Sequence, residues 1–125
     1  MSLTYCLYDN ILLLKLYGDL LGLKDERAFY LLSERHIRMQ RNHCIIDTSS
    51  LGHVNSKGLS IFVRIFTLME QQQLRMVLIA PPAQLQRLLK VTKLDKVFTI
   101  VRTRSEALRL VVHAHPELVE ECATF

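Results

Sequence analysis

The residues best suited to chemistry form one polar segment, which follows a short apolar run at 44–46. The segment supplies carboxylate, hydroxyl, imidazole, amide and amine groups, from Asp47, Ser49, Ser50, His53, Asn55, Ser56 and Lys57. A helix is predicted to begin near Asn55 and Ser56, so free backbone N–H groups and a partial positive charge should lie there. A phosphate on a serine at that place would find donors already directed at it. The simpler interpretation is that Asn55 or Ser56 only caps the helix, which is worth about 1 kcal/mol.

Other residue types that carry chemistry do not form recognisable sites. His113 and His115 would point about 200° apart on a helix, and the sequence has no Cys-x-x-Cys or His-Glu-x-x-His pattern for a metal ion. His36 lies on the apolar face of a predicted helix, as a partly buried, hydrogen-bonded histidine does. Dinucleotide, Walker and nucleophile-elbow motifs are absent, and Asp47 lacks the acidic neighbours of a receiver domain. The sequence therefore predicts no enzyme, no metal ligand and no cofactor.

Length and composition predict one folded domain over 1–125. The chain is 50% hydrophobic and 22% charged, which are globular values. The net charge is +4, and the basic residues are interspersed with acidic ones. We therefore expect a solvated surface and no nucleic-acid groove. No stretch of about 20 apolar residues and no signal peptide are found, which predicts no membrane insertion. Three cysteines, an odd number without framework spacing, argue against a disulfide scaffold and favour a cytoplasmic location.

The elements that must position the polar segment alternate along the chain. Two strands, at 4–8 and 11–17, should form a hairpin through Asp9 and Asn10. A helix at 24–40 is followed by the buried strand 44–46, and Asp47 and Thr48 come directly after that strand. A loop containing Ser49, Ser50, Gly52 and His53 should connect that strand to a helix at 56–72.

The second half of the chain continues the alternation. The run at 76–80 is apolar without a break, as in an inner strand covered on both faces. Pro82 is well placed as the first residue of the next helix, a last strand is expected at 97–101, and Ser105 should cap the final helix. The order β-β-α-β-α-β-α-β-α predicts an α/β fold with a small, mixed, mostly parallel sheet, about four helices and an N-terminal hairpin.

Four segments carry a resemblance to a known family. Asn55-Ser56-Lys57-Gly58-Leu59 resembles the Asp-Ser-Ser-Gly-Leu signature of the STAS domain found in bacterial anti-sigma factor antagonists. Asp47 also stands where that family often has an acidic residue at a strand's end. The segments 16–20, 91–98 and 105–108 are similar to further parts of the family's pattern, in the same order. The resemblance covers most of the chain and implies a STAS fold.

The resemblance also implies a function, that of a non-catalytic regulator which binds a protein partner. In the family, the first serine of the signature accepts phosphate from a partner kinase, often an anti-sigma factor of the histidine-kinase-like ATPase type. The unphosphorylated form binds the partner and the phosphorylated form does not, so Ser56 is the implied acceptor. The implied partner surface comprises Asp47, Ser49, Ser50, Gly52, His53, Asn55, Ser56, Lys57, Gly58, Leu59 and Val63.

Two positions depart from the family's pattern, and they keep alternatives open. Asn55 replaces an aspartate, and Lys57 replaces the second serine. Both changes favour a scaffold that never receives phosphate, in a signalling assembly or beside a transporter or lipid-transport complex. A small enzyme or ligand carrier that uses the loop as an anion site is the third alternative.

The predicted helix after Ser56 has a narrow polar face, formed by Ser60, Arg64, Thr67 and Gln71. The apolar arc around it is wider than one packed stripe requires. Either neighbouring helices cover both flanks, or the flank with Leu59 and Val63 belongs to the partner surface.

Overall fold

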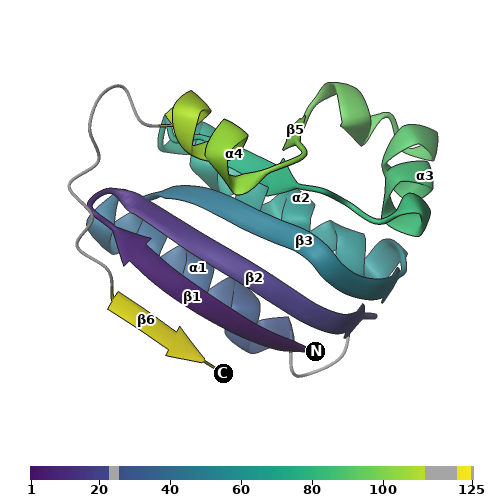
Figure 1. Cartoon of the computed structure of the whole chain (residues 1–125), viewed down its shortest axis with the longest axis horizontal. Coiled ribbons are helices and arrows are strands. Elements are labelled where there is room, and N and C mark those ends of the chain that lie inside the picture. Colours follow the sequence, from purple (N-terminus) through teal and green to yellow (C-terminus); the bar gives the residue numbers. More distant parts are fainter. Residues whose placement is uncertain (23–25, 112–120, 125) are drawn as a thin grey trace.

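The computed structural model describes residues 1–22, 26–111 and 121–124. These residues form strands, four α-helices and one short 3-10 helix (Figure 1). In chain order the elements are β1 (Ser2–Tyr8), β2 (Ile11–Leu20), α1 (Glu26–Gln40), β3 (His43–Val54), α2 (Ser56–Gln71), β4 (Met76–Ile79), α3 (Ala83–Val91), η1 (Leu94–Lys96), β5 (Thr99–Val101), α4 (Arg104–Val111) and β6 (Glu121–Thr124). The predicted alternation of strands and helices is confirmed.

One mixed sheet joins the strands in the order β5-β4-β3-β2-β1-β6. β1 and β2 form the predicted antiparallel hairpin, and β2, β3, β4 and β5 run parallel to their neighbours. β6 pairs antiparallel with β1 at the sheet's edge, a strand that the sequence pattern did not predict. The sheet is therefore mostly parallel in its centre and antiparallel at the hairpin edge.

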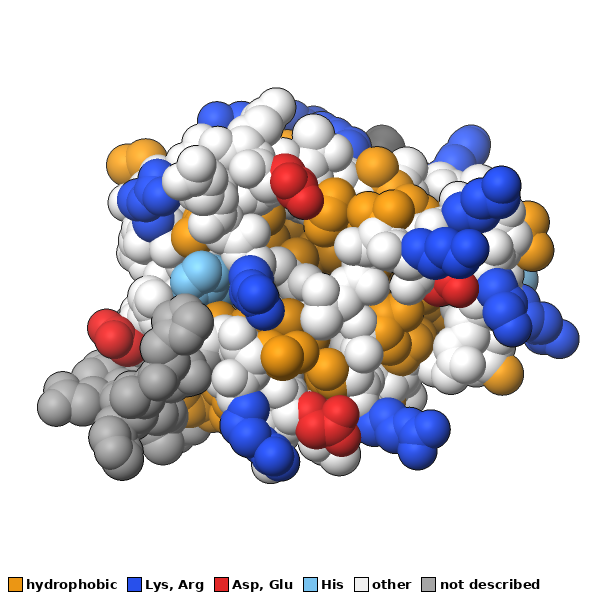
Figure 2. All heavy atoms as spheres, turned by 90° about the horizontal axis from the view of Figure 1, so that it is seen from above, with side chains coloured by type: hydrophobic (Ala, Val, Ile, Leu, Met, Phe, Trp, Pro, Cys, Tyr) orange, Lys and Arg blue, Asp and Glu red, His pale blue; other side chains and the backbone are white. Residues whose placement is uncertain are grey.

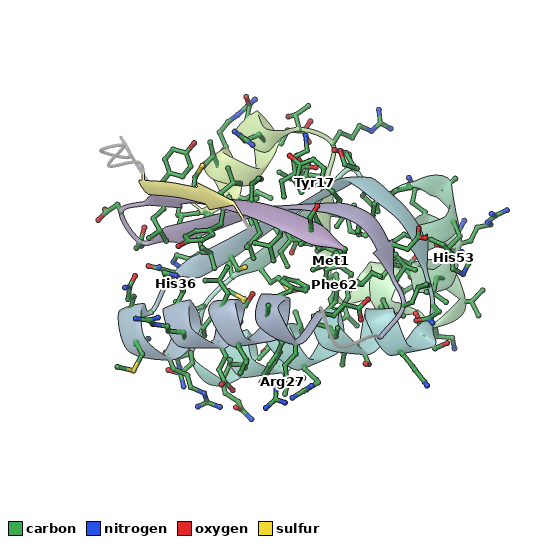
Figure 3. The ribbon with its side chains drawn as sticks, turned by 90° about the horizontal axis from the view of Figure 1, so that it is seen from below. Met1, Tyr17, Arg27, His36, His53 and Phe62 are labelled. Carbon is green, nitrogen blue, oxygen red and sulfur yellow. The ribbon has the colours of Figure 1, made fainter. Side chains whose placement is uncertain are left out.

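Helices cover both faces of the sheet, as Figures 1 and 3 show. The larger core lies under α1, α2 and α3, and it contains Phe29, Phe62 and Leu85. A smaller cluster lies on the opposite face, where Ala107 and Val111 of α4 pack on the sheet. Consecutive strand residues point to opposite faces, so a strand that is covered on both faces, such as β4, is apolar at every position. β4 is buried along its whole length, as predicted.

β3 is much longer than the predicted strand. It continues through Ser49, Ser50, Gly52 and His53 to Val54, so the expected loop is wrong for these residues. The reason is pairing across the sheet, because the upper part of β2 bonds to this segment from Tyr17 to Leu20. Hydrogen bonds to the neighbouring strand β2 hold this polar segment in a strand, although its residue types do not favour one.

Two predicted helix starts are displaced by one or two residues. Pro82 is the N-cap of α3 and not its first residue, since its ψ of 162° is extended. α4 begins at Arg104, and the side chain of Thr103 accepts from the N–H of Glu106 at 3.2 Å, so Thr103 takes the capping role expected of Ser105. The last predicted strand, 97–101, is shortened to β5, because the backbone N–H groups of Val97 and Phe98 donate to the carbonyl of Leu94 in η1.

The cysteines differ from one another. Cys44 is a fully buried free thiol in β3, and burial raises its pKa to about 12. Cys6 is disulfide-bonded, which differs from the reduced cysteines expected in a reducing compartment. In the described residues no helix is long and apolar enough to cross a membrane. His113, His115 and Pro116 lie outside the described residues.

Candidate functional site

The start of α2 is fixed by Asn55, which bonds in two directions. Its side-chain oxygen accepts from the N–H of Gly58 at 2.8 Å, which is the N-cap bond. Its side-chain amide donates to the carbonyl of Leu21 at 3.0 Å, and its backbone N–H donates to Leu20 at 3.3 Å. Asn55 therefore caps the helix and also ties it to the segment that follows β2.

Gly58 lets α2 approach β2 closely. A β-carbon at this position would collide with the carbonyl oxygen of Leu20, and that carbonyl belongs to rigid backbone. The first turn of α2 therefore rests directly on the end of β2. The sequence Asn55 to Gly58 thus sets both the position and the orientation of the serine between them.

Ser56 and Lys57 are the exposed residues of this first turn. Within the described part of the chain, neither their backbone N–H groups nor the Ser56 hydroxyl has a hydrogen-bond partner. Open N–H groups and the positive end of the helix dipole favour an anion here. No described residue places a base on the Ser56 hydroxyl, so this part of the chain does not set Ser56 up as an activated nucleophile.

The strand that leads into α2 is held by side chains from other elements. Gln84 of α3 donates to the Val54 carbonyl at 2.7 Å and accepts from the Val54 N–H at 2.9 Å. Asp19 of β2 accepts from the N–H of His53 at 2.8 Å. Sequence reasoning missed both residues, because these contacts join positions about thirty residues apart and leave no local pattern.

Gly52, His53, Ser56 and Lys57 are the exposed residues at this corner, and together they form what we call the serine surface. Figure 3 shows His53 at the end of the molecule where β3 meets α2. The structure thus brings together four of the residues that the sequence associated with partner binding.

Asp47, Ser49 and Ser50 lie earlier in β3 than the residues of the serine surface. The Asp47 carboxylate is buried and accepts from the N–H of Ser49 at 3.0 Å and from its hydroxyl at 2.6 Å. Asp47 precedes Asn55 by eight strand residues, so on the order of 20 Å of β3 separates it from Ser56. Its observed role is to hold Ser49, and it makes no contact with the serine surface.

The flanks of α2 are largely covered. Leu59 is 4% exposed and packs in the larger core, so it does not belong to an exposed surface. Val63 is half-buried against the same core. The predicted polar face is confirmed, because Ser60, Arg64, Thr67 and Gln71 are all exposed. α1 lies along one flank and the sheet lies under the other, which explains the wide apolar arc.

The rest of the described surface offers few sites for other chemistry. No group of three or more metal-ligating side chains occurs among the described residues. His36 is buried and shares a hydrogen bond with Gln40 at 3.2 Å, as expected of a structural histidine. On the face seen in Figure 2, lysine and arginine side chains are scattered, most of them near the margin, with hydrophobic side chains between them. That face has no continuous basic stripe.

Comparison with known proteins identifies the family. A sequence profile of the STAS domain matches residues 7–107, which is most of the chain. The chain belongs to the STAS family. No curated protein matches it.

Solved structures share the STAS fold at low sequence identity. An anti-sigma factor antagonist from Mycobacterium paratuberculosis is 19% identical, with a TM-score of 0.70, and the match covers 86% of this chain and 93% of that one. The anti-sigma factor antagonist SpoIIAA in its unphosphorylated form is 14% identical, with a TM-score of 0.70 and coverage of 86% and 94%. The Bacillus cell fate determinant SpoIIAA in its phosphorylated form is 18% identical, with a TM-score of 0.61 and coverage of 82% and 92%. The predicted STAS fold is confirmed.

Proposed function

We propose that this STAS protein is a non-catalytic regulatory module whose serine surface binds a protein partner, and that phosphate on Ser56 switches this binding off. One observation carries the proposal. Among the described residues, the Ser56 hydroxyl at the start of α2 has no hydrogen-bond partner, and neither do the two backbone N–H groups beside it. An acceptor needs this combination of accessibility and rigid placement.

The local charges suit a phosphate at this place. Phosphorylation would add a charge of about −1.5 to −2, next to the helix dipole and the exposed amine of Lys57. Asn55 adds no negative charge, whereas an aspartate there would repel the phosphate. The same added charge would change the serine surface from basic to acidic, and a partner fitted to Lys57 and a neutral serine would dissociate.

The partner that this site fits is a kinase that also binds the unmodified protein. The family resemblance favours an anti-sigma factor of the histidine-kinase-like ATPase type. SpoIIAA supports a phosphate switch in this fold, since it has been solved in unphosphorylated and phosphorylated forms. Ser56 occupies the position of the acceptor serine in the STAS signature.

The test is affinity capture from lysate of the native host, with wild-type and Ser56→Glu proteins as parallel baits. We expect wild type to retain an ATPase-type kinase and Ser56→Glu to lose it by at least about tenfold, because a desolvated like-charge contact costs more than 1.4 kcal/mol. Incubation of the captured kinase, ATP and wild-type protein should add one phosphate, which mass spectrometry would place on the peptide containing Ser56.

Ser105→Glu is a matched control. Ser105 is also an exposed serine in the first turn of a helix, but α4 lies on the opposite face of the sheet. This variant should retain the kinase as well as wild type does. Equal retention by Ser56→Glu would refute the switch and would favour a constitutive scaffold, the function for which Asn55 and Lys57 leave room.

A further inference from the structure

A second feature lies beside the serine surface, in a groove between α1 and α2. The groove has a volume of about 680 Å³ and is lined by residues of both helices and by Gly22. Gly22 is required there, because a β-carbon on it would collide with the side chain of Lys57. We call this feature the α1–α2 groove.

Glu26 gives the groove an unusual lining. Its side chain is only 3% exposed, although it lines the groove. One carboxyl oxygen accepts from the N–H of Leu21, and the other, Oε2, is buried and has no hydrogen-bond partner in the part of the chain that the structure describes. Buried polar atoms in native proteins are almost always paired, because an unpaired one forfeits its hydration. Among the described residues, Oε2 therefore has no hydrogen-bond donor.

The other charges of the groove are mainly positive. Arg27, Lys57 and Arg64 are exposed along it, and Figure 3 shows Arg27 pointing away from the sheet. Arg64 is held in place, with its guanidinium 4.1 Å from the centre of the Tyr30 ring. Glu34 also lines the groove, but its carboxylate accepts from the Tyr30 hydroxyl at 3.1 Å and pairs with Arg38 at 3.6 Å. Of the described residues, three cations therefore line the groove beside one acceptor without a donor.

We propose that the α1–α2 groove binds a small phosphate ester that carries hydroxyl groups, such as a sugar or polyol monophosphate. The phosphate pairs with Arg27, Lys57 and Arg64, and a hydroxyl of the same molecule donates to Glu26 Oε2. A purely cationic ligand is disfavoured by the three basic side chains. Inorganic phosphate is a poorer fit, because its only donor is the hydroxyl on phosphorus itself, so a bond to Oε2 would bring the charge of the phosphate against the carboxylate.

The test is titration of the purified protein with ribose 5-phosphate, ribose and inorganic phosphate, followed by calorimetry and by NMR shifts of the α1 and α2 amides. We expect ribose 5-phosphate to bind at least tenfold more tightly than either of the other two. Glu26→Gln should weaken ribose 5-phosphate about tenfold or more, since a hydrogen bond to a charged group is lost. The same variant should bind inorganic phosphate no more weakly than wild type does.

Equal affinity for the three compounds, or no binding of ribose 5-phosphate, overturns the proposal. A lower melting temperature of Glu26→Gln with unchanged affinity also overturns it, because Glu26 would then be only a structural residue. Arg64→Gln changes an exposed side chain, so it is a second test that does not depend on the core. It should weaken ribose 5-phosphate binding, whereas Arg109→Gln on α4 should not.

This proposal and the phosphate switch can fail separately. The Ser56 side chain does not line the groove, so Ser56→Ala should bind ribose 5-phosphate as wild type does, whatever its effect on the kinase. Loss of ribose 5-phosphate binding in Ser56→Ala would show that the ligand sits on the serine surface and not in the α1–α2 groove.

Discussion

The first turns of α2 and α3 are built alike but present different chemistry. Each helix follows a central parallel strand, so both begin at the same edge of the sheet. α2 has a side-chain cap from Asn55, while α3 is capped by Pro82 without any side-chain hydrogen bond. Two helix N-termini at one edge therefore offer a direct comparison of what makes such an end available to a ligand or partner.

The polar side chains of the two turns have different partners. In α3, Gln84 binds Val54 and Gln86 donates to the Pro81 carbonyl at 2.7 Å, so both bond to the protein's own backbone. In α2, Ser56 and Lys57 are exposed beside their open N–H groups. A helix dipole alone does not define a site, since both ends have one. What distinguishes α2 is that its cap is complete without Ser56, which leaves that hydroxyl accessible.

The largest effect should come from the third residue of each turn. In α3 this residue is Leu85, which fills the core, whereas in α2 it is Gly58, which touches the Leu20 backbone. Gly58→Ala should lower the free energy of unfolding by about 2–3 kcal/mol, because neither backbone can move away without strain. Urea denaturation followed by circular dichroism measures this change.

Helix propensity predicts the opposite sign for this variant. Alanine is about 1 kcal/mol better than glycine inside a helix, so a neutral or stabilised Gly58→Ala protein would show that the close approach is unimportant. Thr67→Ala is the control on the exposed face of α2. It should change stability by less than about 0.5 kcal/mol, as surface substitutions usually do.

An intermediate effect is expected from the side chain that joins the two turns. Gln84→Leu removes both hydrogen bonds to Val54 and leaves backbone groups at the end of β3 unpaired. We expect a loss of about 2 kcal/mol, at roughly 1 kcal/mol for each bond. Amide hydrogen exchange at Val54 should accelerate in the same variant.

Gln86→Leu is the matched change in the same helix. It removes a single bond, to Pro81, and should cost about 1 kcal/mol or less. If the two variants lose the same stability and Val54 exchanges at its normal rate in both, Gln84 does not fix the entry to the serine surface.

The sequence predicted the α2 end better than its surroundings because its signals are local. Asn55 and Ser56 are cap residues, the STAS signature is contiguous, and apolar runs mark the central strands. The segment from Ser49 to Val54 was misjudged because serine, glycine and histidine favour loops in isolation, while pairing with β2 makes them a strand. The cap of α4 was misplaced because Thr103 and Ser105 are both good cap residues.

The residues that complete the site could not be predicted from local pattern. Gln84 and Asp19 reach β3 from sequence distances of 30 and 34 residues. Glu26 is an ordinary first-turn acid in the sequence, and its burial and its bond to the N–H of Leu21 depend on the fold. The sequence left open whether Leu59 packs in the core or belongs to the partner surface, because its burial depends on where the sheet lies. Tertiary contacts decide all four positions.

The smallest effect should come from restoring the family's residue next to Ser56. Asn55→Asp keeps the cap bond to Gly58 and gains about 0.3–1 kcal/mol from the helix dipole. It also loses the amide that donates to the Leu21 carbonyl, which costs about 1 kcal/mol and leaves two oxygens facing each other. We expect a net loss of about 0.5 kcal/mol, measured by urea denaturation at pH 7.

Asn10→Asp in the exposed hairpin turn makes the same chemical change without a capping role, and it should leave stability unaltered. An Asn55→Asp protein more stable than wild type would mean that the dipole outweighs the Leu21 bond. Asparagine at position 55 would then be less stabilising than aspartate, and its benefit would have to concern binding at the serine surface. If stability falls as expected, Asn55 is retained for the second bond that an aspartate cannot make, and this turn is tied to β2 more firmly than the STAS signature requires.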